Sequence, residues 1–157
     1  MTLADQLLTR PGATAHAWTT VGRLPDRWEE QEWWVRTLKR EGFTSHFKPA
    51  ERPTEMFTLY RGAPLHRAAG ISWTPSPAVA NMYARCKRGP SGMLGAYLDP
   101  PPGEVWVASV NPAAMLAIMP TQSGTTNRFD EIEVLCDPAG LGSIWHAQHS
   151  WEVAWAL

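Results

Sequence analysis

The amino-acid sequence predicts an α+β domain with mostly antiparallel strands. One amphipathic stretch, residues 25–42, has helical spacing, whereas several short runs between residues 56 and 138 are rich in β-branched and aromatic side chains. Twelve Gly and 14 Pro divide these runs, which indicates short elements joined by many turns. The length of 157 residues suits a single domain. Within it we expect a helical N-terminal part, residues 1–50, and a core over residues 56–157.

The first third of the chain predicts one strong helix. Residues 1–22 are weakly patterned, and we expect a short helix and a meander there. Over residues 25–42 a Pro opens the helix, acidic residues fill its first turn, and Lys and Arg precede a closing Gly. A Pro-containing loop, residues 48–53, then leads to a strand over residues 56–62. We expect Gly62 to stop this strand.

The middle of the chain predicts a strand, a helix and a further short strand. The strand is expected over residues 68–74, followed by a turn rich in Pro. Ser76 is placed to cap a helix whose first residue is Pro77, and the helical spacing continues through residue 88. A stretch rich in Gly and Pro follows, with a short strand expected at residues 93–98.

The last third predicts further strands. Residues 104–110 alternate between apolar and polar positions, as a strand does. Residues 111–119 begin with Asn-Pro, and we expect a turn or a single helical turn. Residues 122–130 read as a polar loop and residues 131–138 as a strand. For residues 143–157 we favour strands over a helix, because aromatic and β-branched side chains are frequent there.

Composition and charge exclude several classes of protein. Apolar residues make up 44 % of the chain and charged residues 18 %, which is typical of a globular domain. The net charge of −1 lacks the basic excess that a duplex nucleic acid requires of its partner. The chain also has no apolar run of the ~20 residues that cross a bilayer and no signal-peptide pattern. The two cysteines, Cys86 and Cys136, have no CxxC spacing. We therefore expect a cytoplasmic protein with no membrane partner.

Common catalytic and metal-binding motifs are absent from the sequence. It contains no P-loop, no dinucleotide-binding glycine motif and no nucleophile elbow. His146, His149 and Glu152 would share one face of a helix and could then hold zinc. Because we expect strand structure there, where residues three apart face opposite sides, we assign no metal.

Tryptophan is the unusual residue in this composition. Nine Trp outnumber four Phe and three Tyr together. A buried indole N–H needs an acceptor. We therefore expect several Trp to anchor the core or to line a cleft.

Three short segments of the sequence, taken in order, indicate a chemical function. Arg61 ends the first strand, and Ser72 and Thr74 share one face of the second. Glu131 and Glu133 share one face of the strand expected over residues 131–138. Two adjacent carboxylates repel each other, so such a pair is typical of a site where a function or a cationic ligand offsets the cost.

This combination resembles the Arg–Ser–Glu class of mono-ADP-ribosyltransferases, which includes cholera-like and clostridial-type toxins and arginine-specific ectoenzymes. The resemblance covers residues 57–138, about half of the chain. It implies two packed, mostly antiparallel sheets around an NAD cleft with flanking helices. It also implies that Arg61 contacts the NAD phosphates and ribose, with Tyr60 and Gly62 bordering the same site.

The resemblance assigns roles to the second strand and to the two glutamates. Ser72 and Thr74 would shape the nicotinamide pocket, and Trp73 stands between them where the family more usually has Thr. Glu133 would be the catalytic residue. Glu131 matches the position where Glu usually accompanies an arginine acceptor. The resemblance therefore implies transfer of ADP-ribose from NAD to an acceptor, such as a protein arginine, with release of nicotinamide.

The positive charge that develops on the ribose gives this assignment a physical reason. Cleavage of the nicotinamide–ribose bond resembles glycoside cleavage, and a carboxylate beside the ribose stabilises that charge. Three alternatives stay open. The protein could be an NAD glycohydrolase that uses water as acceptor. It could be a catalytically silent module that docks a partner on the Trp-rich helix at residues 28–34. It could also be a structural protein of phage or plasmid type.

Overall fold

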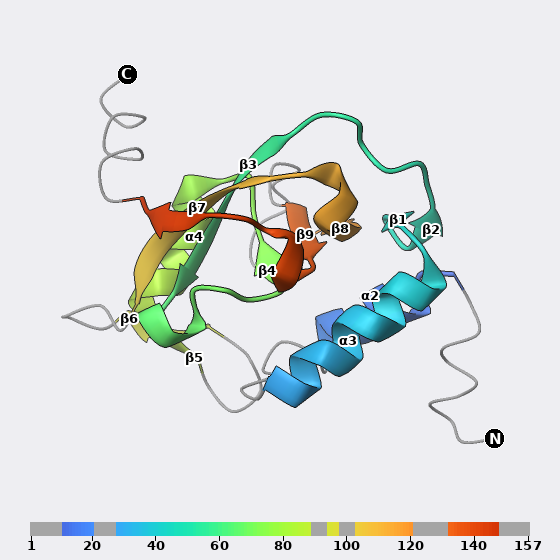
Figure 1. The fold of residues 1–157 in the computed structure, drawn as a ribbon. Coiled ribbons are helices and arrows are strands. Elements are labelled where there is room, and N and C mark those ends of the chain that lie inside the picture. The colour runs from blue at the N-terminus through green and yellow to red at the C-terminus, as the bar shows by residue number, and fades with distance from the viewer. Residues whose placement is uncertain (1–10, 21–27, 89–93, 98–102, 121–131, 148–157) are drawn as a thin grey trace.

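The computed structural model describes residues 11–20, 28–88, 94–97, 103–120 and 132–147 (Figure 1). The described part is a mixed α and β domain with two main sheets, which confirms the expected combination of helices and mostly antiparallel strands. Its helices are α2 (Ala13–Thr20), α3 (Trp28–Glu41) and α4 (Pro77–Arg85), with short 3-10 turns η1 (Leu65–Arg67), η2 (Pro112–Ala114) and η3 (Pro138–Gly140).

The strands form a five-stranded sheet of order β2-β1-β8-β9-β4, a three-stranded sheet of order β10-β7-β3 and a separate β5-β6 pair. Their bounds are β1 (Thr44–Ser45), β2 (Lys48–Pro49), β3 (Phe57–Ala63), β4 (Ser72–Trp73), β5 (Cys86–Arg88), β6 (Leu94–Tyr97), β7 (Glu104–Val110), β8 (Met115–Pro120), β9 (Ile132–Cys136) and β10 (Ile144–His146). Neighbouring strands pair antiparallel except β1 and β8, which pair parallel.

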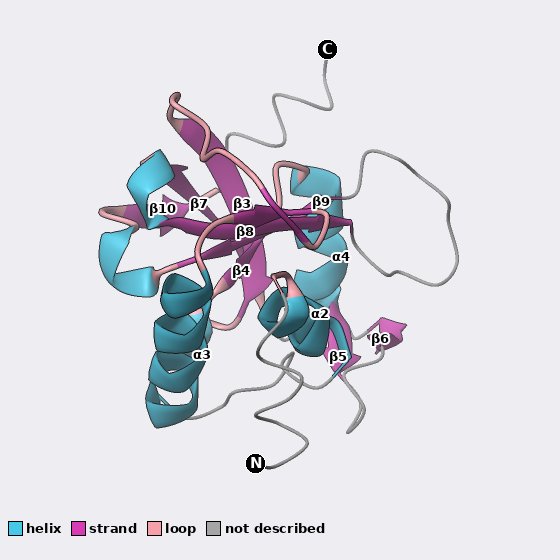
Figure 2. Cartoon of the chain, turned by 90° about the vertical axis from the view of Figure 1, so that its right-hand side faces the viewer, coloured by secondary structure: helices cyan, strands magenta, loops and turns pink. Residues whose placement is uncertain are grey.

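Helices and sheets stack in layers. Helices α2 and α3 pack against the five-stranded sheet on one side, and α4 packs on β3 and β7 on the other (Figure 1). Figure 2 shows the strands of both sheets gathered at the centre with helices around them. The core between the two sheets joins Leu59 and Trp106 of the smaller sheet to Trp73 and Val134 of the larger one. Burial of these apolar side chains on both sheets holds the layers together.

One backbone connection joins the two sheets. Tyr60 in β3 and Thr74, directly after β4, form an antiparallel bridge. The Tyr60 N–H donates to the Thr74 carbonyl at 2.7 Å, and the Thr74 N–H donates back at 2.9 Å. This bridge brings Arg61 next to the strand that carries Ser72, although β3 and β4 belong to different sheets.

Several predicted elements are confirmed. Helix α3 lies within the stretch expected to be helical, residues 25–42, of which residues 25–27 lie outside the described part. Gly42 after it has a φ of 90°, and its N–H donates to the Leu38 carbonyl at 3.1 Å. That arrangement is a common helix C-terminus. Ser76 caps α4, since its hydroxyl accepts the Val79 N–H at 3.3 Å. Strands β3, β6, β7 and β9 lie where strands were expected.

Other expectations are wrong. Gly62 does not stop β3, which continues through Ala63 because β7 pairs with it along its whole length. The strand expected over residues 68–74 is reduced to β4, because only Ser72 and Trp73 pair in register with β9, and Thr74 turns to bridge Tyr60 of β3. The helix expected through residue 88 ends at Arg85, since residues 86–88 pair with β6.

The structure differs most from the expectation at residues 111–119. A turn is present at η2, but β8 follows it and pairs with both β9 and β1. Both faces of β8 are covered, and Met115, Leu116, Ala117 and Met119 are all buried. A strand buried on both faces shows no alternation, which explains why the pattern did not predict it. Predictions for residues 1–10, 122–130 and 148–157 lie outside the described residues.

Candidate functional site

A pocket lies where β3, β4, β9 and α4 meet. Its cavity volume is about 30 Å³, and the space in front of it opens to solvent. It is lined by Tyr60, Arg61, Gly62, Ser72, Trp73, Thr74, Val79, Ala80, Tyr83 and Glu133. The structure thus brings Arg61, Ser72 and Glu133 together, although 11 and then 61 residues separate them in the sequence.

The Glu133 carboxylate is the buried acid of this pocket. Glu133 is only 7 % exposed. The Ser72 hydroxyl donates to Oε1 of Glu133 at 2.5 Å from the adjacent strand. The Trp18 indole N–H donates to the same oxygen at 2.9 Å. Among the described residues no donor contacts the second oxygen, Oε2. Hydrogen bonds from the described residues therefore hold the carboxylate at one oxygen.

Sequence reasoning missed the residues of α4 that line the pocket, Val79, Ala80 and Tyr83, and it missed Trp18, which holds Glu133. Trp18 is the least expected of these. It lies in α2, 115 residues before Glu133, within the weakly patterned start of the chain. The one available signal was the general need of a buried indole N–H for an acceptor. That signal does not say which of nine Trp meets which acceptor.

Arg61 is held by two backbone carbonyls. Its Nε donates to the Arg67 carbonyl at 3.0 Å, and its Nη1 donates to the Ser72 carbonyl at 2.9 Å. The guanidinium fills the space beside Gly70, where a Cβ would stand 2.2 Å from Cζ of Arg61. These contacts fix the plane of the guanidinium at the wall of the pocket and tie β3 to the segment before β4.

The residues on either side of Ser72 differ in where their side chains lie. The Trp73 ring is 1 % exposed, packs in the core between the sheets, and donates its indole N–H to the Gly70 carbonyl at 2.8 Å. Trp73 therefore supports the pocket wall from the core. The hydroxyl of Thr74 accepts the Ser76 N–H at 3.1 Å, which shapes the turn into α4.

Gly62, in β3, lets helix α4 form a further wall of the pocket. A Cβ on Gly62 would stand 1.9 Å from the Ala80 carbonyl oxygen and 2.5 Å from the Ala84 nitrogen. Helix α4 can therefore pack directly on β3 only because residue 62 has no side chain. This close approach places Val79, Ala80 and Tyr83 along the pocket.

The remaining predicted residues are placed as follows. Glu131 lies outside the described residues, as do His149 and Glu152. His146 in β10 lies 3.4 Å from a carboxylate oxygen of Glu104 and packs edge-on against Trp106. Burial, with a smaller contribution from Asp137, raises the pKa of the Cys136 thiol, so this cysteine is a packed side chain and not a nucleophile.

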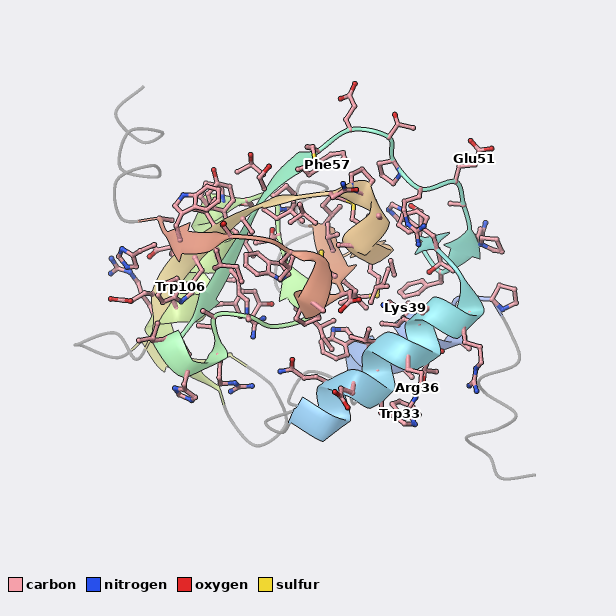
Figure 3. The ribbon with its side chains drawn as sticks, viewed as in Figure 1. Trp33, Arg36, Lys39, Glu51, Phe57 and Trp106 are labelled. Atoms are coloured by element: carbon pink, nitrogen blue, oxygen red, sulfur yellow. The ribbon has the colours of Figure 1, made fainter. Side chains whose placement is uncertain are left out.

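A second hollow contains none of the predicted site residues. It lies between α3 and η3, and it is lined by Gln31, Glu32, Val35, Arg36, Lys39, Asp137, Pro138 and Ala139. Arg36 and Lys39 project from α3 (Figure 3), and Lys39 pairs with Asp137 at 2.5 Å. This ion pair joins α3 to the end of β9.

Comparison with known proteins identifies no relative: no family model, no curated protein and no solved structure matches the chain. In the part of the chain that the structure describes, none of the helices has the length and apolar character needed to span a membrane.

Proposed function

We propose that this pocket binds NAD and transfers its ADP-ribose to an acceptor, with release of nicotinamide. The observation that carries the proposal is the Glu133 carboxylate, fixed in the pocket by Ser72 with Arg61 in the same wall. We further propose that the packed sheets have the ADP-ribosyltransferase-like arrangement, with the cleft where β3 meets β4 and β9. The resemblance of the sequence to the Arg–Ser–Glu class supports both proposals.

The chemistry of the donor set fits the nicotinamide half of NAD. A nicotinamide and its ribose would lie at the mouth of the pocket, against the wall that carries Ser72 and Glu133. Tyr60 and Tyr83 offer aromatic surface beside it. Arg61 supplies a planar cation of the kind that binds a diphosphate. The adenosine half would lie beyond this pocket.

Glu133 would act through its negative charge. NAD supplies a nicotinamide that leaves with the electrons of its bond to ribose C1′, and its ring nitrogen thereby loses its positive charge. Positive charge develops on the ribose as that bond breaks. The Glu133 carboxylate stabilises this charge, and Oε2 accepts a hydrogen bond from a ribose hydroxyl. Burial in a site with little water strengthens the interaction.

The acceptor completes the reaction at ribose C1′. Its nucleophilic atom forms the new bond to that carbon and gives up a proton. We propose that Glu131 orients an arginine acceptor and takes this proton. When water is the acceptor instead, the same centre releases free ADP-ribose, which is the reaction of an NAD glycohydrolase.

Labelled NAD tests the proposal. The protein is incubated with NAD labelled in the adenylate part, with and without a cell lysate, and nicotinamide and macromolecular label are measured in parallel. We expect nicotinamide release together with label on protein. Glu131→Gln is expected to reduce protein labelling while release of free ADP-ribose continues. An absence of nicotinamide release in both conditions would refute the proposed function.

A further inference from the structure

We propose that Trp18 is a positioning residue for Glu133: its indole N–H fixes the rotation of the carboxylate that faces the ribose. The inference rests on the proposed function, and it adds helix α2 to a site otherwise built from β3, β4, β9 and α4. It begins from the 2.9 Å bond between Nε1 of Trp18 and Oε1 of Glu133.

Two donors from different elements converge on the same carboxylate oxygen. Ser72 approaches Oε1 from β4 at 2.5 Å, and Trp18 approaches it from α2. A single hydrogen bond leaves a carboxylate free to pivot about the contact, whereas a second donor on the same oxygen, from another direction, restricts that rotation. Trp18 and Glu133 are 3 % and 7 % exposed. Water therefore has little access to Oε1 and does not compete with the two side-chain donors. The orientation of Oε2 is therefore set by both donors together.

The packing around Trp18 keeps its donor in place. The ring meets Trp34 of α3 edge-on, with 5.2 Å between ring centroids. It belongs to the cluster in which Ala15 and Leu38 pack against Leu135 of β9. Alternation along β9 puts Leu135 on the same face as Glu133, so this cluster adjoins the carboxylate directly.

Helix α2 is also anchored at its start. The Thr14 N–H donates to a Glu41 carboxylate oxygen at 3.2 Å, which ties α2 to the end of α3. Gly12 packs directly on the backbone of Phe47, because a Cβ there would stand 2.0 Å from the Phe47 carbonyl oxygen. The helix that carries Trp18 is thus fixed on two sides.

The chemistry of the indole suits this task. Trp donates one hydrogen bond, carries no charge and does not titrate. A Lys, an Arg or a protonated His in the same place would neutralise the carboxylate and weaken its effect on a developing positive charge. A neutral donor positions Glu133 without removing the charge on which the proposed reaction depends.

The test is Trp18→Phe, with Trp106→Phe as the matched control. Each substitution keeps an aromatic ring and removes one buried indole N–H; that of Trp106 donates to the Ala63 carbonyl at 2.8 Å. Trp106 lies away from α3 and packs in the core between the two sheets (Figure 3). Both variants are expected to lower the Tm by similar amounts. Only Trp18→Phe is expected to lower kcat for nicotinamide release, by about 10- to 100-fold with KM within about twofold.

Equal kcat losses in the two variants, or a raised KM with unchanged kcat for Trp18→Phe, would overturn the proposal. If Trp18→Phe does not fold, indole ¹H–¹⁵N spectra of the wild type and Glu133→Gln replace it. One slowly exchanging indole resonance is expected to shift strongly in Glu133→Gln, and the absence of such a shift overturns the proposal. If the wild type releases no nicotinamide, the proposed function fails and the positioning role fails with it. If the wild type is active and Trp18→Phe keeps its kcat, the positioning role alone fails.

Discussion

Gly62→Ala probes the contact that forms the helical wall of the pocket. A Cβ at residue 62 would stand 1.9 Å from the Ala80 carbonyl oxygen and 2.5 Å from the Ala84 nitrogen, whereas an ordinary contact begins near 3.4 Å. Both atoms belong to the backbone of α4, so no side-chain rotation can relieve the overlap. Helix α4 and strand β3 must instead separate by roughly 1.5 Å, the difference between the first distance and an ordinary contact.

The cost follows from that geometry. Overpacking a core costs ~1–3 kcal/mol when side chains can adjust, and the backbone contact places this substitution at or above ~3 kcal/mol. For a domain of this size each kcal/mol lowers the Tm by ~2–4 °C, so we expect a decrease of ~6–12 °C. Nicotinamide release should fall as well, because Val79 and Tyr83 move with the helix. Thermal denaturation followed by circular dichroism measures the first effect.

Gly42→Ala is the control for loss of glycine itself. Gly42 has a φ of 90°, and a Cβ added there would meet no atom within 4 Å, so its substitution should cost only backbone strain, ~1–2 kcal/mol. Gly62→Ala should be clearly the more damaging of the two. A Tm for Gly62→Ala within about 2 °C of the wild type, less than the shift expected for 1 kcal/mol, would show that α4 and β3 are not in the contact described, and the reasoning would be refuted.

Three further predictions test other contacts. Arg61→Lys loses the planar fork and should weaken NAD binding at least about tenfold by calorimetry; unchanged affinity would leave Arg61 a structural tie only. Asp137→Ala removes the oxygen that caps η3 by accepting the Ala139 N–H at 3.0 Å, together with the ion pair to Lys39. It should cost at least ~1 kcal/mol in thermal denaturation, and an unchanged Tm would contradict both contacts. Cys136, in a Cys86→Ser variant, should resist thiol reagents at about pH 8 until the protein unfolds, since burial raises the pKa of its thiol and keeps it protonated. Fast labelling of the native protein would contradict that burial.

Local patterns in the sequence predicted the elements whose signals are local. Helix α3 has an amphipathic face and a closing Gly, α4 has Ser76 as its cap, and β7 alternates. Strand β8 was missed because its residues 115–119 are covered on both faces and so show no alternation. Local signals report which side of an element is buried, and they fail where both sides are.

The residues of the candidate site differ in the same way, because some could be predicted from the sequence and Trp18 could not. Arg61, Ser72 and Glu133 could be singled out because each stands at a strand position that a family resemblance marks, and the structure places all three in one pocket. Trp18 could not, because its bond to Glu133 depends on the packing of α2 against the five-stranded sheet. Nothing within a few residues of Trp18 encodes that contact.

The rate of nicotinamide release from NAD by the wild type and by Glu133→Gln tests the central claim most directly. Glutamine keeps the size of the side chain and an oxygen that can accept from Ser72 and Trp18, so the fold should persist. It removes the negative charge, and loss of one such stabiliser costs ~2.7–4 kcal/mol, a decrease of about 10²–10³ in kcat. We predict a wild type that releases nicotinamide and a folded Glu133→Gln variant that is slower by that factor. Equal rates in the two proteins would contradict the assignment of Glu133 as the catalytic residue.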